Sequence, residues 1–115
     1  MKGALLAAVI AVLLAGCQTA RPLYYWGHYE SLIYQDYTNP GKTTPEAGAR
    51  LLEEDLQKAA AANLPPHPGL HAHLGYLYYQ MGRLDQARQE FAQEKALFPE
   101  SAPFMDRMLA RLTPK

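Results

Sequence analysis

The chain has 115 residues, of which 11 are Lys or Arg and 11 are Asp or Glu, so its formal net charge is zero. This balance provides no field that would attract nucleic acid and no polybasic patch for acidic lipids. Cys17 is the only cysteine, which excludes an internal disulfide. Length and composition therefore indicate one small domain that does not bind nucleic acid.

The N-terminus carries one positive charge at Lys2, followed by an uninterrupted apolar run over residues 4–15 and then by Gly16 and Cys17. The run is too short to span a bilayer as a stable helix, for which about 20 residues are needed, but it suits a cleavable export signal. A small residue directly before the only cysteine resembles the lipobox of bacterial lipoproteins. The resemblance implies lipidation of Cys17 and removal of residues 1–16. The alternative is an ordinary signal peptide with an incidental free cysteine.

Gln18, rather than Asp, follows the cysteine. By resemblance to lipoproteins of double-membraned bacteria, this favours sorting to the outer membrane, with the domain facing the periplasm. Because the chain is nearly neutral, attachment depends on the lipid, to which each buried methylene contributes about 0.8 kcal/mol. We therefore expect a signal peptide over residues 1–16 and a lipidated, aromatic-rich segment over residues 17–42.

Aromatic residues crowd into residues 24–37, which hold Trp26 and five of the eight tyrosines. A disordered tether is poor in aromatics, so this segment is expected to pack against something. Four apolar residues recur at spacings of three, four and four, the helical period: Trp26, Tyr29, Ile33 and Tyr37. They predict a short helix over about residues 27–37, which the turn residues 39–41 end.

The remainder of the chain alternates helical periodicity with helix-breaking turns, and the alternation typical of strands is absent from the sequence. Residues 43–46 predict a helix start with a Thr cap and a Glu three residues on, and the prolines of residues 64–68 predict its end. Further helices are expected over residues 69–81, over 85–98 with Asp85 as the cap, and over 101–112 with Ser101 as the cap. The fold class is therefore all-α.

Periodicity also predicts which helix faces are buried. In the last helix, Phe104, Met108 and Leu112 line up at spacings of four. The run from Glu53 to Asp55 is expected to lie on a solvated face.

Residues 71–99 carry the spacing of the tetratricopeptide signature: an aromatic residue, x2-Leu-Gly-x2-Tyr, Ala-x3-Phe and Pro. The matching residues are Leu74, Gly75, Tyr78, Ala87, Phe91 and Pro99. Gly75 and Ala87 leave room where two helices cross, and the larger residues fill the space beside the crossing. Residues 43–115 thus resemble a tetratricopeptide-like helical hairpin with flanking helices. The alternative is a generic helical hairpin that matches by chance.

Two positions depart from this signature: His71 stands where a large aromatic is usual, and Glu94 where a small residue is usual. In the signature's register, four residues would line the inner groove and form the candidate site for a partner: Ala72, Tyr76, Tyr79 and Gln80. They form either a ligand surface or the seat of the aromatic segment. Docking of the aromatic segment onto this groove is favoured, because a chain this short has few other residues with which to form a core.

Catalytic and metal-binding sets are absent from the sequence. His71 and His73 would point about 200° apart on a helix, and no second cysteine or nearby carboxylate completes a zinc set with them or with His67. Ser31 and Ser101 lack a nucleophile motif. The sequence therefore predicts no metal, no cofactor and no enzymatic activity.

The lipobox-like residues, residues 24–30 (YYWGHYE) and residues 94–101 (EKALFPES) together resemble a family of small bacterial lipoproteins with a domain of unknown function. Members are similar to proteins encoded beside a curli-secretion-type lipoprotein. The resemblance implies such a lipoprotein as partner and a role in an outer-membrane complex for surface assembly or export. We expect a non-catalytic, lipid-anchored periplasmic adaptor that binds an envelope protein. The alternative is a cell-envelope maintenance factor that binds peptidoglycan or activates a wall enzyme.

Overall fold

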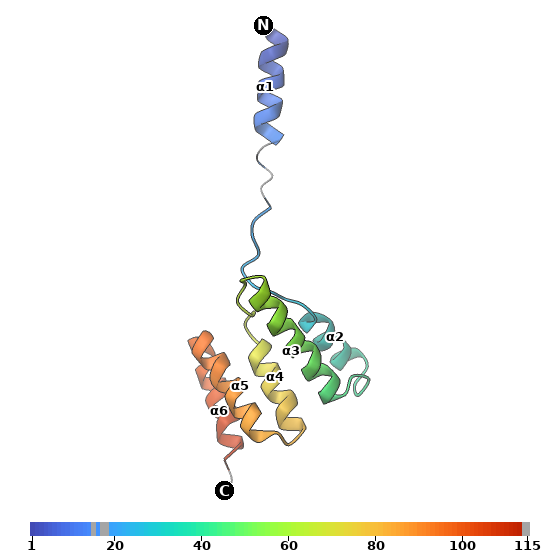
Figure 1. Ribbon diagram of the computed structural model, residues 1–115, viewed down its shortest axis with the longest axis vertical. Helices are drawn as coiled ribbons and strands as arrows, with labels where there is room; N and C mark the ends of the chain where they lie inside the picture. The colour runs from blue at the N-terminus through green and yellow to red at the C-terminus, as the bar shows by residue number, and fades with distance from the viewer. Residues whose placement is uncertain (15, 17–18, 114–115) are drawn as a thin grey trace.

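The computed structural model describes residues 1–14, 16 and 19–113, and its regular elements are helices (Figure 1). They are α1 (Lys2–Leu14), α2 (Tyr29–Thr38), α3 (Pro45–Ala61), α4 (Leu70–Gln80), α5 (Leu84–Leu97), the 3₁₀ helix η1 (Pro99–Ser101) and α6 (Ala102–Arg111). The expected all-α class is confirmed. Within the described residues, the only β pairing is an isolated bridge between Tyr25 and Pro66.

Helices α2 to α6 form the folded body, whereas α1 lies outside it at the end of an extended segment (Figure 1). Residues 1–10 of α1 are exposed. Of the helices that the structure describes, none has both the length and the apolar character needed to cross a bilayer.

The centre of the body is the close pairing of α4 with α5. Gly75 lies against Phe91, because a Cβ placed on Gly75 would be 2.7 Å from Cε1 of that ring. Leu74, Tyr78 and Ala87 are buried around the same crossing. The Tyr78 hydroxyl also donates a hydrogen bond to the Glu53 carboxylate of α3, and burial together with this bond raises the pKa of Tyr78.

Helix α6 covers the hairpin with a different face from the one that the sequence predicts. Met105, Met108 and Leu112 are buried, while Phe104 is 53% exposed. A row with spacings of four drifts around a helix of 3.6 residues per turn, whereas spacings of three and four keep one face toward the core. Phe104 therefore does not share the buried face of Met108 and Leu112.

The helix starts differ in part from the predicted caps. Thr44, rather than Thr43, caps α3, and its hydroxyl accepts a hydrogen bond from the Ala47 N–H at 3.2 Å. The prediction that Asp85 caps the helix is wrong, because Asp85 lies inside the first turn of α5 and pairs with Arg88. Ser101 occupies the cap position of α6, but its side chain makes no capping bond because η1 leads directly into the helix.

Asp55 of α3 is fully buried, so the prediction of a solvated face was wrong for this residue. Its carboxylate accepts a hydrogen bond from the His28 N–H at 2.6 Å and one from His28 Nδ1 at 2.7 Å. Gly27, which has φ of +51°, leaves room for this contact, because a Cβ there would overlap the Asp55 carboxylate. The start of α2 is thereby fixed to α3.

The aromatic segment packs against the body, but the residues that make the contact are not those that the helical period predicts. Trp26 stacks on the fully buried ring of His67, with centroids 4.4 Å apart. In α2 the buried residue is Leu32, while Tyr37 is 85% exposed. The four residues from Trp26 to Tyr37 therefore do not form one buried helical face, because Trp26 precedes α2 and its position is set by the turn at Gly27.

We expect Gly75→Leu to destabilise the domain. The larger side chain would meet Phe91, which is buried and has no room to move, and overpacking of this kind costs about 1–3 kcal/mol. Urea unfolding would measure the loss. Ala92→Leu on the exposed face of the same hairpin is the matched control and should leave the free energy of unfolding unchanged. Equal stability of the two variants would contradict the close crossing.

Asp55→Ala is expected to loosen the start of α2. Removal of the carboxylate takes away two hydrogen bonds that hold the start of α2, and the loss of one such bond costs about 0.5–1.5 kcal/mol. Urea unfolding should show the loss, and limited proteolysis should cut within residues 23–38 first. Glu54→Ala removes an exposed carboxylate from the residue that directly precedes Asp55, and it should leave both measurements unchanged. Slow proteolysis of residues 23–38 in the Asp55 variant would count against this role.

Candidate functional site

A pocket of about 420 Å³ opens between α2, α4 and α6. Its walls combine residues from each helix and from the segments beside them: Tyr29, Gly69, Ala72, His73, Tyr76, Phe91, Glu94, Ser101, Phe104, Met105 and Met108. We call this pocket the α2–α6 groove. Its lining is mainly apolar and aromatic, with a small number of polar groups, as is typical of ligand sites.

The two sides of the groove are aromatic. From α2, the ring of Tyr29 meets His73 edge-on, with centroids 5.9 Å apart. From α6, Phe104 lines the opposite side, and the Arg107 guanidinium lies 5.6 Å from its ring centroid. Ala72 and Tyr76 of α4 lie between these walls, and the small Ala72 side chain leaves the space open.

Glu94 is the charged group of the lining, and it is nearly fully buried. One of its oxygens accepts a hydrogen bond from the Gly69 N–H at 2.8 Å, and the other accepts one from the Ala72 N–H at 3.3 Å. The carboxylate therefore caps α4 from α5, at the end where the helix dipole favours negative charge. This explains why Glu replaces the small residue of the repeat signature.

The second departure from the signature has a similar explanation. His71 is buried, and its Nδ1 lies 2.6 Å from the Glu90 carboxylate, one helical turn before Glu94. A polar bridge between α4 and α5 thus stands where the signature has a large aromatic.

Burial favours the neutral forms of the two other titratable groups in the groove, His73 and Tyr29. Burial lowers the pKa of His73, although Asp36 at 3.7 Å opposes this. Burial and the negative charge of Glu94 raise the pKa of the Tyr29 hydroxyl. The buried Ser101 hydroxyl has no hydrogen-bond partner among the described residues. Within those residues, no three His, Cys, Asp or Glu side chains lie together as a metal site requires.

The four residues that the sequence places in a partner groove do not share one pocket. Ala72 and Tyr76 line the α2–α6 groove, whereas Gln80 lines a second hollow of about 300 Å³ that Tyr76 also borders. Tyr79 is 40% exposed and is not part of either lining. The sequence places Tyr29 in the segment expected to dock here without singling it out, and it gives no sign that Phe104 belongs to the site.

The aromatic segment forms a wall of the groove through Tyr29, and Tyr76 stays exposed beside the opening. The predicted lipidation site, Cys17, lies outside the residues that the structure describes.

Fold and groove together define an all-α protein of packed helices with an aromatic-lined hollow between them. The sequence model of the family described as "Domain of unknown function (DUF4810)" matches residues 23–108, and the chain therefore belongs to this family. Comparison with curated proteins and with solved structures gave no match. The expected membership of a family with a domain of unknown function is confirmed, and the lipoprotein and tetratricopeptide assignments stay predictions.

Proposed function

We propose that the protein is a non-catalytic adaptor, anchored by a lipid on Cys17 to the bacterial outer membrane, whose groove binds an envelope protein on the periplasmic side. The observation that carries this proposal is the open groove between α2, α4 and α6. The resemblance to proteins encoded beside a curli-secretion-type lipoprotein makes such a lipoprotein the first partner to test.

The size and lining of the groove favour a protein segment as its ligand. A volume of about 420 Å³ holds one or two large side chains, and Tyr29, Tyr76 and Phe104 surround that space with aromatic rings. Aromatic residues dominate the energetics of many protein interfaces because they bury large areas with few rotatable bonds. Hollows beside the first helix of a helical hairpin are also where tetratricopeptide-like repeats would offer a binding surface.

The polar groups of the groove support binding rather than catalysis. The Glu94 carboxylate is engaged by two backbone N–H groups of α4, so it is poorly placed to take up a proton from a substrate. Activation of a Ser nucleophile needs a base within hydrogen-bond reach, and in the described part of the chain the Ser101 hydroxyl has no partner of any kind.

We test the groove by in-cell photo-crosslinking from position Tyr76, which is exposed at its opening. A discrete protein adduct is expected, whereas a crosslinker at the exposed Gln89 of α5 should give none. Phe104→Glu should abolish the adduct, because it places a charge in an apolar wall. The control Leu84→Glu, exposed but outside the groove lining, should retain it.

Adducts of equal yield from Tyr76 and Gln89 would refute the groove as the docking surface. Sedimentation of the protein with purified peptidoglycan sacculi, without a protein adduct, would instead favour the maintenance function.

Cys17→Ala is expected to abolish lipidation, so the precursor should no longer fractionate with the outer membrane. Membrane fractionation and metabolic labelling with a fatty acid would measure both effects. The matched change Gln18→Ala keeps the thiol and should keep the label. Normal outer-membrane fractionation of the Cys17 variant would refute the anchor.

A further inference from the structure

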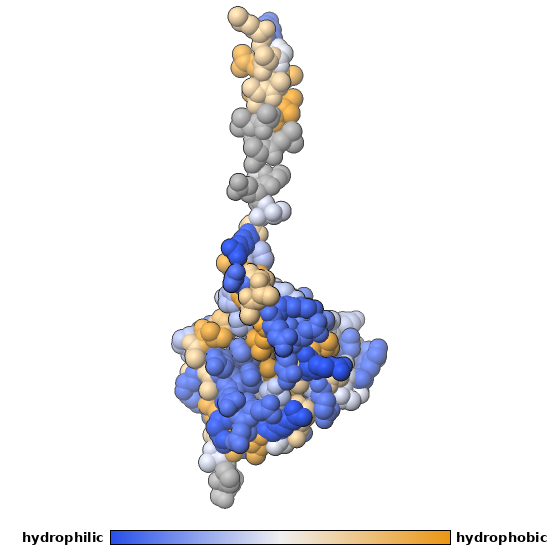
Figure 2. All heavy atoms as spheres, in the orientation of Figure 1, coloured by the Kyte–Doolittle hydropathy of each residue, from blue (hydrophilic) through white to orange (hydrophobic). Residues whose placement is uncertain are grey.

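An exposed apolar surface lies at the end of the body where the N-terminal segment enters. It comprises the exposed Leu23, Trp26 and Leu97 and the half-buried Tyr24 and Phe98, and we call it the tether-end patch. The rings of Tyr24 and Phe98 are 6.1 Å apart, so the N-terminal segment and the end of α5 meet here. Leu23, Trp26 and Leu97 are each among the exposed large apolar residues. In Figure 2, hydrophobic residues lie where the tether joins the body, next to hydrophilic ones.

The patch is built into the fold and is not a loose end of the chain. The Tyr25 N–H donates a hydrogen bond to the Pro65 carbonyl at 3.1 Å, and Trp26 is stacked on the buried His67. One face of the indole is thus covered by the body, while Trp26 as a whole stays 45% exposed. The aromatic rings are therefore held in place at the surface without being withdrawn from it.

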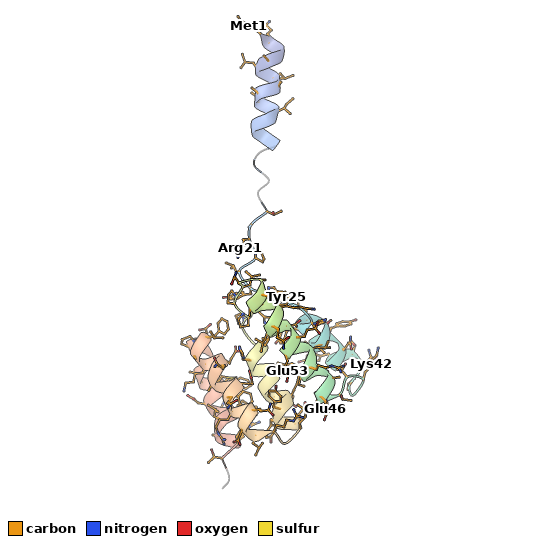
Figure 3. All side chains as sticks on the ribbon, viewed as in Figure 1. Met1, Arg21, Tyr25, Lys42, Glu46 and Glu53 are labelled. Atoms are coloured by element: carbon orange, nitrogen blue, oxygen red, sulfur yellow. The ribbon has the colours of Figure 1, made fainter. Side chains whose placement is uncertain are left out.

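The position of the predicted anchor determines what this patch would meet. Leu23 lies six positions after Cys17 in the sequence, and an extended chain spans about 3.3–3.6 Å per residue. The patch would then lie within about 20 Å of a lipid held at Cys17, which is less than the thickness of one bilayer core. Arg21 lies on the same short tether (Figure 3) and is exposed.

We infer that the tether-end patch is a membrane-contact surface that rests on the phospholipid interface beside the anchor. This inference rests on the proposed function, because the anchor brings the patch to the bilayer. Tyr and Trp favour the headgroup region, where one part of the ring is apolar and another is wet. Arg21 supplies a cation at the depth of the lipid phosphates.

The orientation that follows turns the C-terminal end of α6 away from the bilayer. The C-terminal end of α6 lies at the opposite end of the body from the tether (Figure 1). The basic residue Arg111 at that end therefore cannot contact the same lipids as Trp26.

The experiment uses the full lipidated protein reconstituted in phosphatidylethanolamine–phosphatidylglycerol vesicles, with some lipids brominated near the headgroup end of the acyl chain. Trp26 is the only tryptophan, so its emission reports on the patch alone. We expect strong quenching by the brominated lipid and a blue shift of the emission. In the matched control, Trp26→Phe with Tyr79→Trp, the sole tryptophan lies at the far end of α4 and quenching should be several-fold weaker.

A second variant keeps the result interpretable if Trp26→Phe alters the packing. Leu23→Asp with Leu97→Asp places two charges in the patch at exposed positions and should reduce the quenching of Trp26 while the protein still floats with the vesicles. Unquenched Trp26 in wild-type protein that floats would overturn the contact surface but leave the anchor standing. Wild-type protein that does not float would overturn the anchor and this inference together.

Discussion

Carboxylates withdrawn from water and bound by backbone N–H groups hold the helical body in its arrangement. Asp55 accepts from the His28 N–H at the start of α2, and Glu94 accepts from the Gly69 N–H at the start of α4. Burial of a carboxylate is costly unless hydrogen bonds compensate it, and a helix start supplies free N–H groups and a favourable dipole. Each contact therefore permits only one placement of the two helices that it joins.

The same arrangement occurs twice along the chain. In both cases the second helix of a hairpin supplies a carboxylate to the start of the first helix, at separations of 27 and 25 residues. A glycine with positive φ stands at each start, Gly27 at +51° and Gly69 at +97°. Asp55 and Glu94 thus act alike at the starts of α2 and α4, although α2 packs much less closely on α3 than α4 does on α5. Helix α6 covers the end of the row. The groove is the hollow that this row leaves beside α4.

Local patterns in the sequence predict the helices well, because apolar periodicity and proline turns act over a few residues. They miss the roles of Asp55 and Glu94, since a carboxylate on a helix is normally solvated and its partner here is a quarter of the chain away. For the same reason, the sequence predicts only some of the residues that line the groove. Ala72 and Tyr76 share one helix, whereas Tyr29 and Phe104 reach the site only through tertiary packing.

One buried ring connects the proposed partner surface with the proposed membrane surface. His67 is fully buried, and its centroid lies 4.4 Å from Trp26 in the tether-end patch and 4.3 Å from Tyr29 in the groove wall. Interiors packed this closely do not deform at one contact alone. Trp26, His67 and Tyr29 therefore pack as one unit, and the two proposed surfaces share the same short segment at the start of α2.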